Sequence, residues 1–215
     1  MSSPQAYLFD LDGTLIDSQA DIAASVNRML QARGYPPREL ELFRQMVGDG
    51  MEKLVERALP EQARDAETIR AGVAEYRANY ELHWQEQTRP YEGIIEMLAS
   101  LKARGFKLGV ISNKAHRFTV PMTEHFFGKD LFDIILGARP EVPHKPAPDA
   151  AHEVAAIWSL PTSEIAYVGD SGIDMDFAKA SGMRAIGVRW GFRGEKELQE
   201  HGADLLISHP CELAA

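Results

Sequence analysis

The chain has 215 residues, a length that fits one sizeable domain or a domain with a modest insert. Its 45% hydrophobic and 26% charged residues are typical of a soluble globular protein and exclude a disordered, collagen-like or coiled-coil chain. The formal net charge of -9 argues against nucleic acid or an anionic membrane as a partner.

The N-terminus has neither a basic start nor the apolar stretch of a secretory signal, and no run reaches the ~18 apolar residues of a membrane span. Cys211 is the only cysteine, so an intramolecular disulfide is excluded. We therefore expect a cytoplasmic protein in a reducing compartment.

The first predicted strand is the apolar run at residues 6–9. Residues 17–88 then read as successive helices, the first beginning after a possible N-cap at Ser18 and ending at Gly34. From residue 92 onward, helical segments alternate with short apolar runs that have the length of buried strands, at 108–111, 134–136, 165–168, 185–188 and 205–207.

This alternation of strands and helices predicts an α/β fold. We expect a Rossmann-like core with a parallel sheet of about six strands covered by helices. The core is assigned to residues 1–16 and 89–215, and the helical segment at 17–88 is assigned to an inserted cap domain.

Polar residues follow several of the predicted strands. Asp10 ends the first strand, Ser112 and Asn113 end the strand at 108–111, and Asp170 ends the one at 165–168. Lys145 lies in the loop after the strand at 134–136. Because ligands of open parallel sheets bind at the carboxyl ends of the strands, these side chains are expected at one edge.

These residue types suit phosphoryl transfer. A carboxylate can attack phosphorus and form an aspartyl phosphate, and a second carboxylate two residues along can exchange protons with the leaving group and with water. The oxygen ligands of Asp10 and Asp170 favour Mg²⁺, while Lys145 and the Ser112 hydroxyl can offset and bind phosphate oxygens.

Four segments, "DLDGTLIDS", "SNK", "HKPAPD" and "GDSGID", resemble in that order the motifs of the haloacid dehalogenase-like phosphohydrolase superfamily. The resemblance implies that Asp10 is the nucleophile and Asp12 the general acid/base. It implies a metal held by the Asp10 carboxylate, the Asp12 backbone carbonyl and Asp170, with Asp174 in support.

The same resemblance assigns phosphate binding to Ser112, Asn113 and Lys145, and it implies that the insert closes over the substrate as a cap. Within the superfamily, two segments most resemble the phosphoglycolate phosphatases and their near relatives. They are "VGDGMEKLVERAL" and the C-terminal segment at residues 189–213. Gly48 and Gly50 of the first of these segments are the candidate substrate-specificity positions, where backbone amides can approach a carboxylate.

The implied partner is a small phosphorylated metabolite, with 2-phosphoglycolate first, and the implied assembly is a monomer or homodimer. Alternatives are a phosphatase of a sugar phosphate, nucleoside monophosphate or pyrophosphate, a phosphomutase, and a non-enzymatic receiver-like phosphoprotein. At the level of single residues, Asp17 is interpreted as a helix-capping residue, and "GFRG" around Arg193 is either a surface turn or a loop near the active edge.

Overall fold

The computed structural model describes residues 4–214. The chain divides into two compact units, one formed by residues 4–16 and 90–214 and the other by Asp17–Arg89. The boundary lies within one residue of the division that the sequence suggests.

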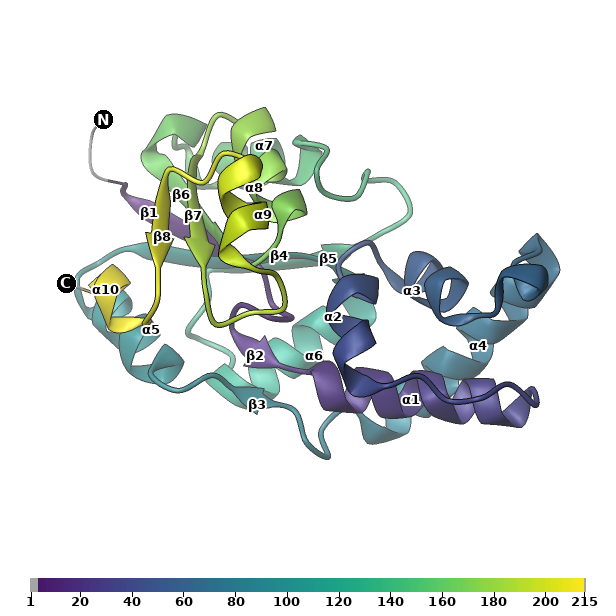
Figure 1. Ribbon diagram of the computed structural model, residues 1–215. Helices are drawn as coiled ribbons and strands as arrows, with labels where there is room; N and C mark the ends of the chain where they lie inside the picture. Colours follow the sequence, from purple (N-terminus) through teal and green to yellow (C-terminus); the bar gives the residue numbers. More distant parts are fainter. Residues whose placement is uncertain (1–3, 215) are drawn as a thin grey trace. The chain divides into compact units, whose positions relative to one another are not determined.

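The larger unit is built on a six-stranded, fully parallel sheet with the order β5-β4-β1-β6-β7-β8 (Figure 1). The strands are β1 (Ala6–Phe9), β4 (Lys107–Ala115), β5 (Ile134–Ala138), β6 (Ile165–Gly169), β7 (Arg184–Val188) and β8 (Leu205–Ile207). The predicted six-stranded parallel sheet is confirmed, and β1, the first strand in the sequence, lies at its centre between β4 and β6.

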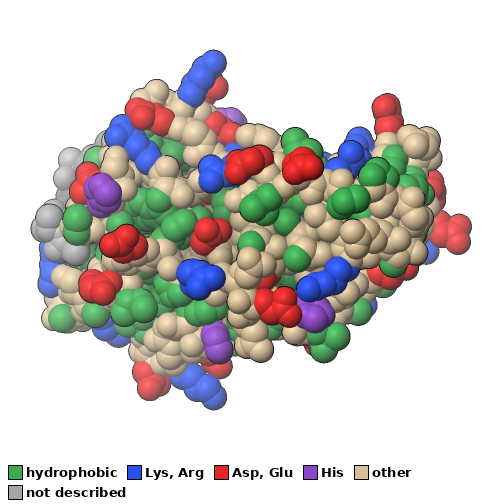
Figure 2. Space-filling view, turned by 60° about the horizontal axis from the view of Figure 1, so that its bottom comes forward, with side chains coloured by type: hydrophobic (Ala, Val, Ile, Leu, Met, Phe, Trp, Pro, Cys, Tyr) green, Lys and Arg blue, Asp and Glu red, His purple; other side chains and the backbone are tan. Residues whose placement is uncertain are grey.

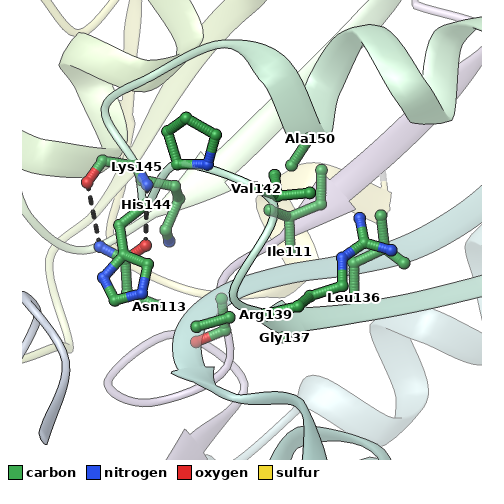
Figure 3. A pocket seen from close by; sticks show the side chains of 12 residues that line it. Ile111, Asn113, Leu136, Gly137, Arg139, Val142, His144, Lys145 and Ala150 are labelled. Carbon is green, nitrogen blue, oxygen red and sulfur yellow. Dashed lines mark hydrogen bonds between the residues drawn. The ribbon is translucent and has the colours of Figure 1, made fainter.

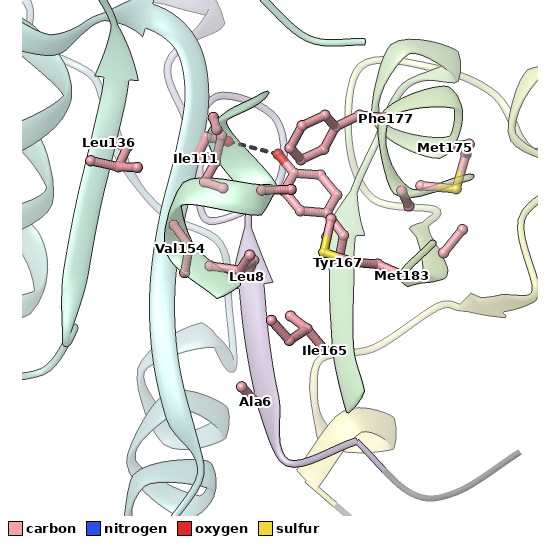
Figure 4. Close-up of a cluster of buried hydrophobic side chains, with 14 of the residues drawn as sticks. Ala6, Leu8, Ile111, Leu136, Val154, Ile165, Tyr167, Met175, Phe177 and Met183 are labelled. Carbon is pink, nitrogen blue, oxygen red and sulfur yellow. Dashed lines mark hydrogen bonds between the residues drawn. The ribbon is translucent and has the colours of Figure 1, made fainter. Parts of the chain in front are cut away.

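The central strand is buried on both faces, as its unbroken apolar run predicts. On one face Leu8 belongs to a cluster with Ile111 and Tyr167, to which the helices at Asp149–Trp158, Gly172–Ala180 and Glu195–Glu200 contribute side chains (Figure 4). On the other face the Tyr7 ring packs edge-on against Phe106, with 5.2 Å between ring centroids. Packing on both faces fixes the direction in which β1 delivers the residues that follow it.

Helices follow the strands as expected for this class of fold. In the larger unit they are α5 (Ile94–Ala103), α6 (His116–Phe127), α7 (Asp149–Trp158), α8 (Gly172–Ala180), α9 (Glu195–Glu200) and α10 (Cys211–Ala214). In α5, Ile94 and Met97 are buried, whereas Ile95 is 54% exposed. A shift of one residue turns a side chain by about 100° around a helix.

The smaller unit is helical, with α1 (Gln19–Ala32), η1 (Leu40–Leu42), α2 (Phe43–Met46), α3 (Met51–Ala58), η2 (Glu61–Ala63) and α4 (Ala66–His83). Ser18 does occupy the N-cap position of α1, but its side chain makes no cap hydrogen bond. Instead Asp17 Oδ1 accepts a hydrogen bond of 3.3 Å from the Gln19 N–H. The capping interpretation of Asp17 thus has a direct structural counterpart.

The chain crosses between the units twice, at residues 16–17 and 89–90. Two short strands at these places, β2 (Ile16–Asp17) and β3 (Arg89–Pro90), form a separate two-stranded sheet.

The described residues contain no helix that is both long and apolar enough to span a membrane. On the face drawn in Figure 2, acidic and basic side chains alternate among apolar ones, so the basic residues seen there form no continuous patch.

Candidate active site

The carboxyl end of β1 carries the first predicted site residue. Asp10 continues the ladder by donating its N–H to Val168 O at 2.9 Å, and its side chain is buried. Lys145 Nζ lies 3.1 Å from Asp10 Oδ1. Apart from this ion pair, no described residue donates a well-aligned hydrogen bond to Oδ1. A buried carboxylate oxygen in this state is available to a ligand or an electrophile.

Lys145 is held in place at both its backbone and its ammonium group. Asn113 clamps the backbone, since Asn113 Oδ1 accepts the Lys145 N–H at 2.8 Å and Nδ2 donates to Lys145 O at 3.1 Å (Figure 3). The ammonium donates to Asp174 Oδ1 and to the Tyr167 hydroxyl, each at 2.7 Å. The Asn113 side chain therefore orients Lys145 here, and its direct contact with a phosphate stays a prediction.

Asp170 lies at the end of β6, and each of its two carboxylate oxygens has a donor. Oδ1 accepts the Thr14 hydroxyl at 3.2 Å, and Oδ2 accepts the Phe192 N–H at 2.7 Å. Gly13, with φ +85°, makes room for this carboxylate, because a Cβ at that position would lie 2.4 Å from Asp170 Oδ2.

Asp174 is occupied by the protein itself. Its Oδ2 accepts the Ser171 N–H at 3.0 Å and the Ser171 hydroxyl at 2.7 Å in the capping box of α8, and its Oδ1 accepts from Lys145. With both oxygens engaged, Asp174 is better suited to positioning Lys145 than to binding a ligand directly, and its support of a metal stays a prediction.

The three buried carboxylates of Asp10, Asp170 and Asp174 have oxygens within 4.8 Å of one another. Burial, with smaller contributions from Asp174 and Asp12, raises the pKa of Asp10 to about 6, even though Lys145 acts in the opposite direction. Burial and the negative charges of Asp174 and Asp10 raise the pKa of Asp170 well above its ordinary value. One ammonium thus faces three carboxylates, and the cluster is short of positive charge.

The same carboxylates also shift the pKa of the Lys145 ammonium group. Burial alone lowers the pKa of Lys145, but the attraction of Asp10 and Asp174 outweighs it, so the pKa is raised. Lys145 is therefore a cation at neutral pH.

Asp12 does not join this cluster. Both of its carboxylate oxygens accept hydrogen bonds from Lys114 Nζ, at 3.1 and 3.0 Å. Lys114 belongs to the "SNK" segment, but the sequence predicts a role only for Ser112 and Asn113 of that segment and does not predict this contact. The available signal was a lysine at the end of a strand whose neighbours were already assigned to the site.

Ser112 is a further polar residue that β4 places at the candidate site. It is buried, and its Oγ accepts the Lys114 N–H at 3.3 Å. The register between β4 and β5 shifts between Ile111 and Ala115, so the strand is irregular where it carries the polar residues. Such irregularities re-aim side chains near active sites.

The segment around Arg193 lies beside the site and is not a free surface turn. The Trp190 indole N–H donates to Thr14 O at 3.0 Å, and the Phe192 N–H reaches Asp170. Arg193 is itself buried and lies 3.5 Å from Glu197. The sequence left both interpretations open, and the structure favours a loop that supports Asp170.

A small cavity of about 20 Å³ is lined in part by Asn113 and Lys145 (Figure 3). Ser112, Leu136 and Arg139 are among its lining residues, and exposed His144 lies at its edge. The volume is enough for about one water molecule, so it is not a substrate pocket.

The predicted specificity positions belong to the smaller unit. Gly50, with φ +87°, is the N-cap of α3, and Gly48 has φ +127°. Asp49 between them pairs with Arg57 at 2.6 Å. These contacts explain the turn, and a role of Gly48 and Gly50 toward substrate stays a prediction.

Comparison with known proteins places this geometry in a family. The profile of the haloacid dehalogenase-like hydrolases matches residues 7–188. The chain belongs to the haloacid dehalogenase-like hydrolases. The superfamily resemblance predicted from the four motifs is confirmed, and so is the fold that it implies.

Several members of this hydrolase family resemble the chain over most of its length. It is 34% identical to a phosphoglycolate phosphatase of Chromobacterium violaceum, over 97% of this chain and 94% of the relative. It is 36% identical to one of Neisseria meningitidis, over 87% and 81% of the two chains. The crystal structure of a predicted phosphoglycolate phosphatase from Haemophilus somnus superposes with a TM-score of 0.92 at 26% identity, covering 99% of this chain and 97% of the other.

Proposed function

We propose that this hydrolase is a Mg²⁺-dependent phosphatase that hydrolyses 2-phosphoglycolate through an aspartyl phosphate on Asp10. The observation that carries the proposal is the Asp10 carboxylate, held at the end of a rigid central strand with Oδ1 buried beside Lys145 and without a well-aligned donor among the described residues. The names of the relatives support the choice of substrate.

The donor set fits Mg²⁺. Hard carboxylate oxygens from Asp10 and Asp170 are what this ion prefers, and it needs few protein ligands because it keeps waters and phosphate oxygens. The shortage of positive charge among the three buried carboxylates supports a divalent cation at this place. Asp10, Asp170 and the Asp12 backbone carbonyl would hold the ion, with Asp174 behind them, and it would supply charge neutralisation for the transferring phosphoryl group.

Each of these residues has its own role in the proposed reaction. Asp10 attacks phosphorus and the bond to the leaving alkoxide breaks, while the alkoxide takes a proton from Asp12. Water next attacks the phosphoryl group, gives a proton to Asp12 and releases Asp10 with inorganic phosphate. Lys145 and the Ser112 hydroxyl stabilise phosphate oxygens throughout.

The smaller unit is proposed to be a cap that excludes water during the first transfer and selects the leaving group. Gly48 and Gly50 are its candidate contacts to a substrate carboxylate. We also propose a cytoplasmic setting and a monomer or homodimer, which light scattering of the purified protein distinguishes.

The function is tested by measuring phosphate release with Mg²⁺ from phosphoglycolate, sugar phosphates, nucleoside monophosphates and pyrophosphate, compared by kcat/KM. We expect the highest value for phosphoglycolate and no turnover after EDTA treatment. Asp10→Asn should abolish turnover and the acid-stable incorporation of label from radioactive substrate. A flat profile would indicate a generalist phosphatase, and isomerised sugar phosphate without free phosphate would indicate a phosphomutase.

A further inference from the structure

Two lysines form ion pairs with different carboxylates at this edge of the sheet. Lys145, from the loop after β5, contacts Asp10 and Asp174. Lys114, from the irregular end of β4, contacts Asp12 through both carboxylate oxygens. The mechanism above uses Lys145 and leaves Lys114 without a task.

The Lys114–Asp12 pair is well enclosed. The two side chains are 7% and 10% exposed, in contrast to the Lys102–Asp133 pair of the same unit, whose side chains are 36% and 37% exposed. A surface ion pair contributes little and leaves both partners mobile, whereas an enclosed pair with contacts to both oxygens restricts the rotation of the carboxylate. Burying the two charges costs solvation free energy, which offsets their attraction, so such a pair need not stabilise the fold. It does hold the carboxylate in a fixed orientation.

The backbone of β4 supports this geometry. The Lys114 N–H donates to Ser112 Oγ at 3.3 Å, so the residue that carries the ammonium is tied to a side chain that is predicted to bind phosphate. The ammonium that holds Asp12 and the predicted phosphate-binding hydroxyl therefore come from the same three residues of one strand, 112–114.

We propose that Lys114 is a positioning residue that fixes the Asp12 carboxylate for proton exchange with the leaving group and with water. This role rests on the proposed phosphatase mechanism, in which Asp12 donates a proton as the bond from phosphorus to the leaving oxygen breaks. Lys114 itself exchanges no proton in either step. Its loss misplaces Asp12 and leaves the nucleophile and Lys145 where they are.

The role predicts a dependence on the leaving group. An alkoxide such as that of phosphoglycolate needs a proton to depart, whereas p-nitrophenolate departs without one. A variant that misplaces Asp12 therefore slows the first transfer from the alkyl ester but not from the aryl ester. With the aryl ester, the second step still needs Asp12 as a base, so the phosphoenzyme accumulates.

The experiment compares wild-type protein, Lys114→Met and the exposed control Lys102→Met in stopped-flow assays with both esters. For Lys114→Met we expect kcat on phosphoglycolate to fall by about 10- to 100-fold, within the range for general acid–base catalysis. With p-nitrophenyl phosphate we expect a burst of nitrophenolate at the wild-type rate, followed by slow turnover. Lys102→Met should match the wild type on both esters.

A double-mutant cycle keeps the test informative if Lys114→Met is poorly folded. Asp12→Asn/Lys114→Met contains no unpaired buried charge, and since Lys114 acts only through Asp12, it should be as active as Asp12→Asn alone. Additive losses in the cycle, or equal slowing of both esters without a burst, would overturn the role of Lys114. Failure of the wild type to release phosphate from either ester would instead remove the proposed function.

Discussion

The Tyr167 hydroxyl lies 2.7 Å from Lys145 Nζ, at the point where the hydrophobic core meets the candidate site. The same hydroxyl donates to Ile111 O at 2.7 Å, so it joins β6 to β4 across the central strand (Figure 4). The ring packs edge-on against Phe177 of α8 at 4.8 Å between centroids. A core tyrosine therefore connects the sheet directly to the lysine of the site.

Tyr167→Phe should impair both stability and activity. It leaves Ile111 O without this donor and Lys145 without one acceptor, and a buried unsatisfied group costs about 1–3 kcal/mol. We expect that loss in the free energy of unfolding measured with urea, together with a lower kcat. Tyr7→Phe removes a hydroxyl on the opposite face of the sheet and is the matched control. Equal effects of the two substitutions would contradict the importance of the Lys145 contact.

Gly191→Ala should weaken the binding of Mg²⁺. An added Cβ would lie 2.2 Å from Asp170 Cβ and 2.5 Å from Gly13 O, so the loop that gives the Phe192 N–H to Asp170 has to move. Isothermal titration calorimetry should show at least a tenfold weaker Mg²⁺ affinity, which corresponds to about 1.4 kcal/mol. Gly194→Ala, three residues along, meets nothing within 4 Å and should bind Mg²⁺ as the wild type does.

The fold, and the residues of the candidate site that follow the strands, could be predicted from the sequence because both depend on local patterns. The strands are short apolar runs, and Asp10, Ser112 and Asp170 follow three of them, so strand order alone brings them together. Lys114 could not be assigned in this way. Its contact with Asp12 depends on a strand irregularity that the pattern of apolar residues does not encode.

The support of Asp170 by residues near the C-terminus was equally hidden from the sequence. The Phe192 N–H is a backbone donor, and any residue type there could supply it. The sequence shows only that residue 191, which closely approaches Asp170, is a glycine. A glycine in "WGFRG" is equally typical of a surface turn, so it does not predict this contact.

The buried carboxyl groups of Asp10 and Asp170 should make a contribution to the stability of the metal-free protein that falls as pH rises from about 4 to 7. The pKa of Asp10 is 3.8 in its ordinary state and about 6 in the folded protein, mainly because of burial. Between these values the folded state holds a proton that the unfolded state has released, so the contribution is full below 3.8 and is lost as pH rises through 6. The raised pKa of Asp170 acts in the same direction.

Thermal unfolding in EDTA at several pH values measures this effect, and Asp170→Asn separates it from other titrating groups. The decline in Tm should be smaller in the variant, because one of the contributing carboxyl groups is gone. Added Mg²⁺ should raise the wild-type Tm more at pH 7.5 than at pH 5, since the ion binds ionised carboxylates. An equal Mg²⁺ effect at both pH values would argue against a metal at this cluster.

Asp21→Ala should destabilise the smaller unit. Asp21 is buried in α1, and its carboxylate accepts the N–H groups of Gln87 and Thr88 and the Thr88 hydroxyl, at 2.7 to 3.1 Å. Removing it leaves two backbone donors at the end of the insert without their acceptor, which we expect to cost about 3 kcal/mol in unfolding free energy. Thr88→Val removes a single donor and keeps the shape of the side chain, so it should cost about 1 kcal/mol or less. Hydrogen exchange followed by mass spectrometry should show the larger loss of protection at residues 85–89 in Asp21→Ala, and unchanged protection there would mean that the carboxylate does not hold this end of the insert.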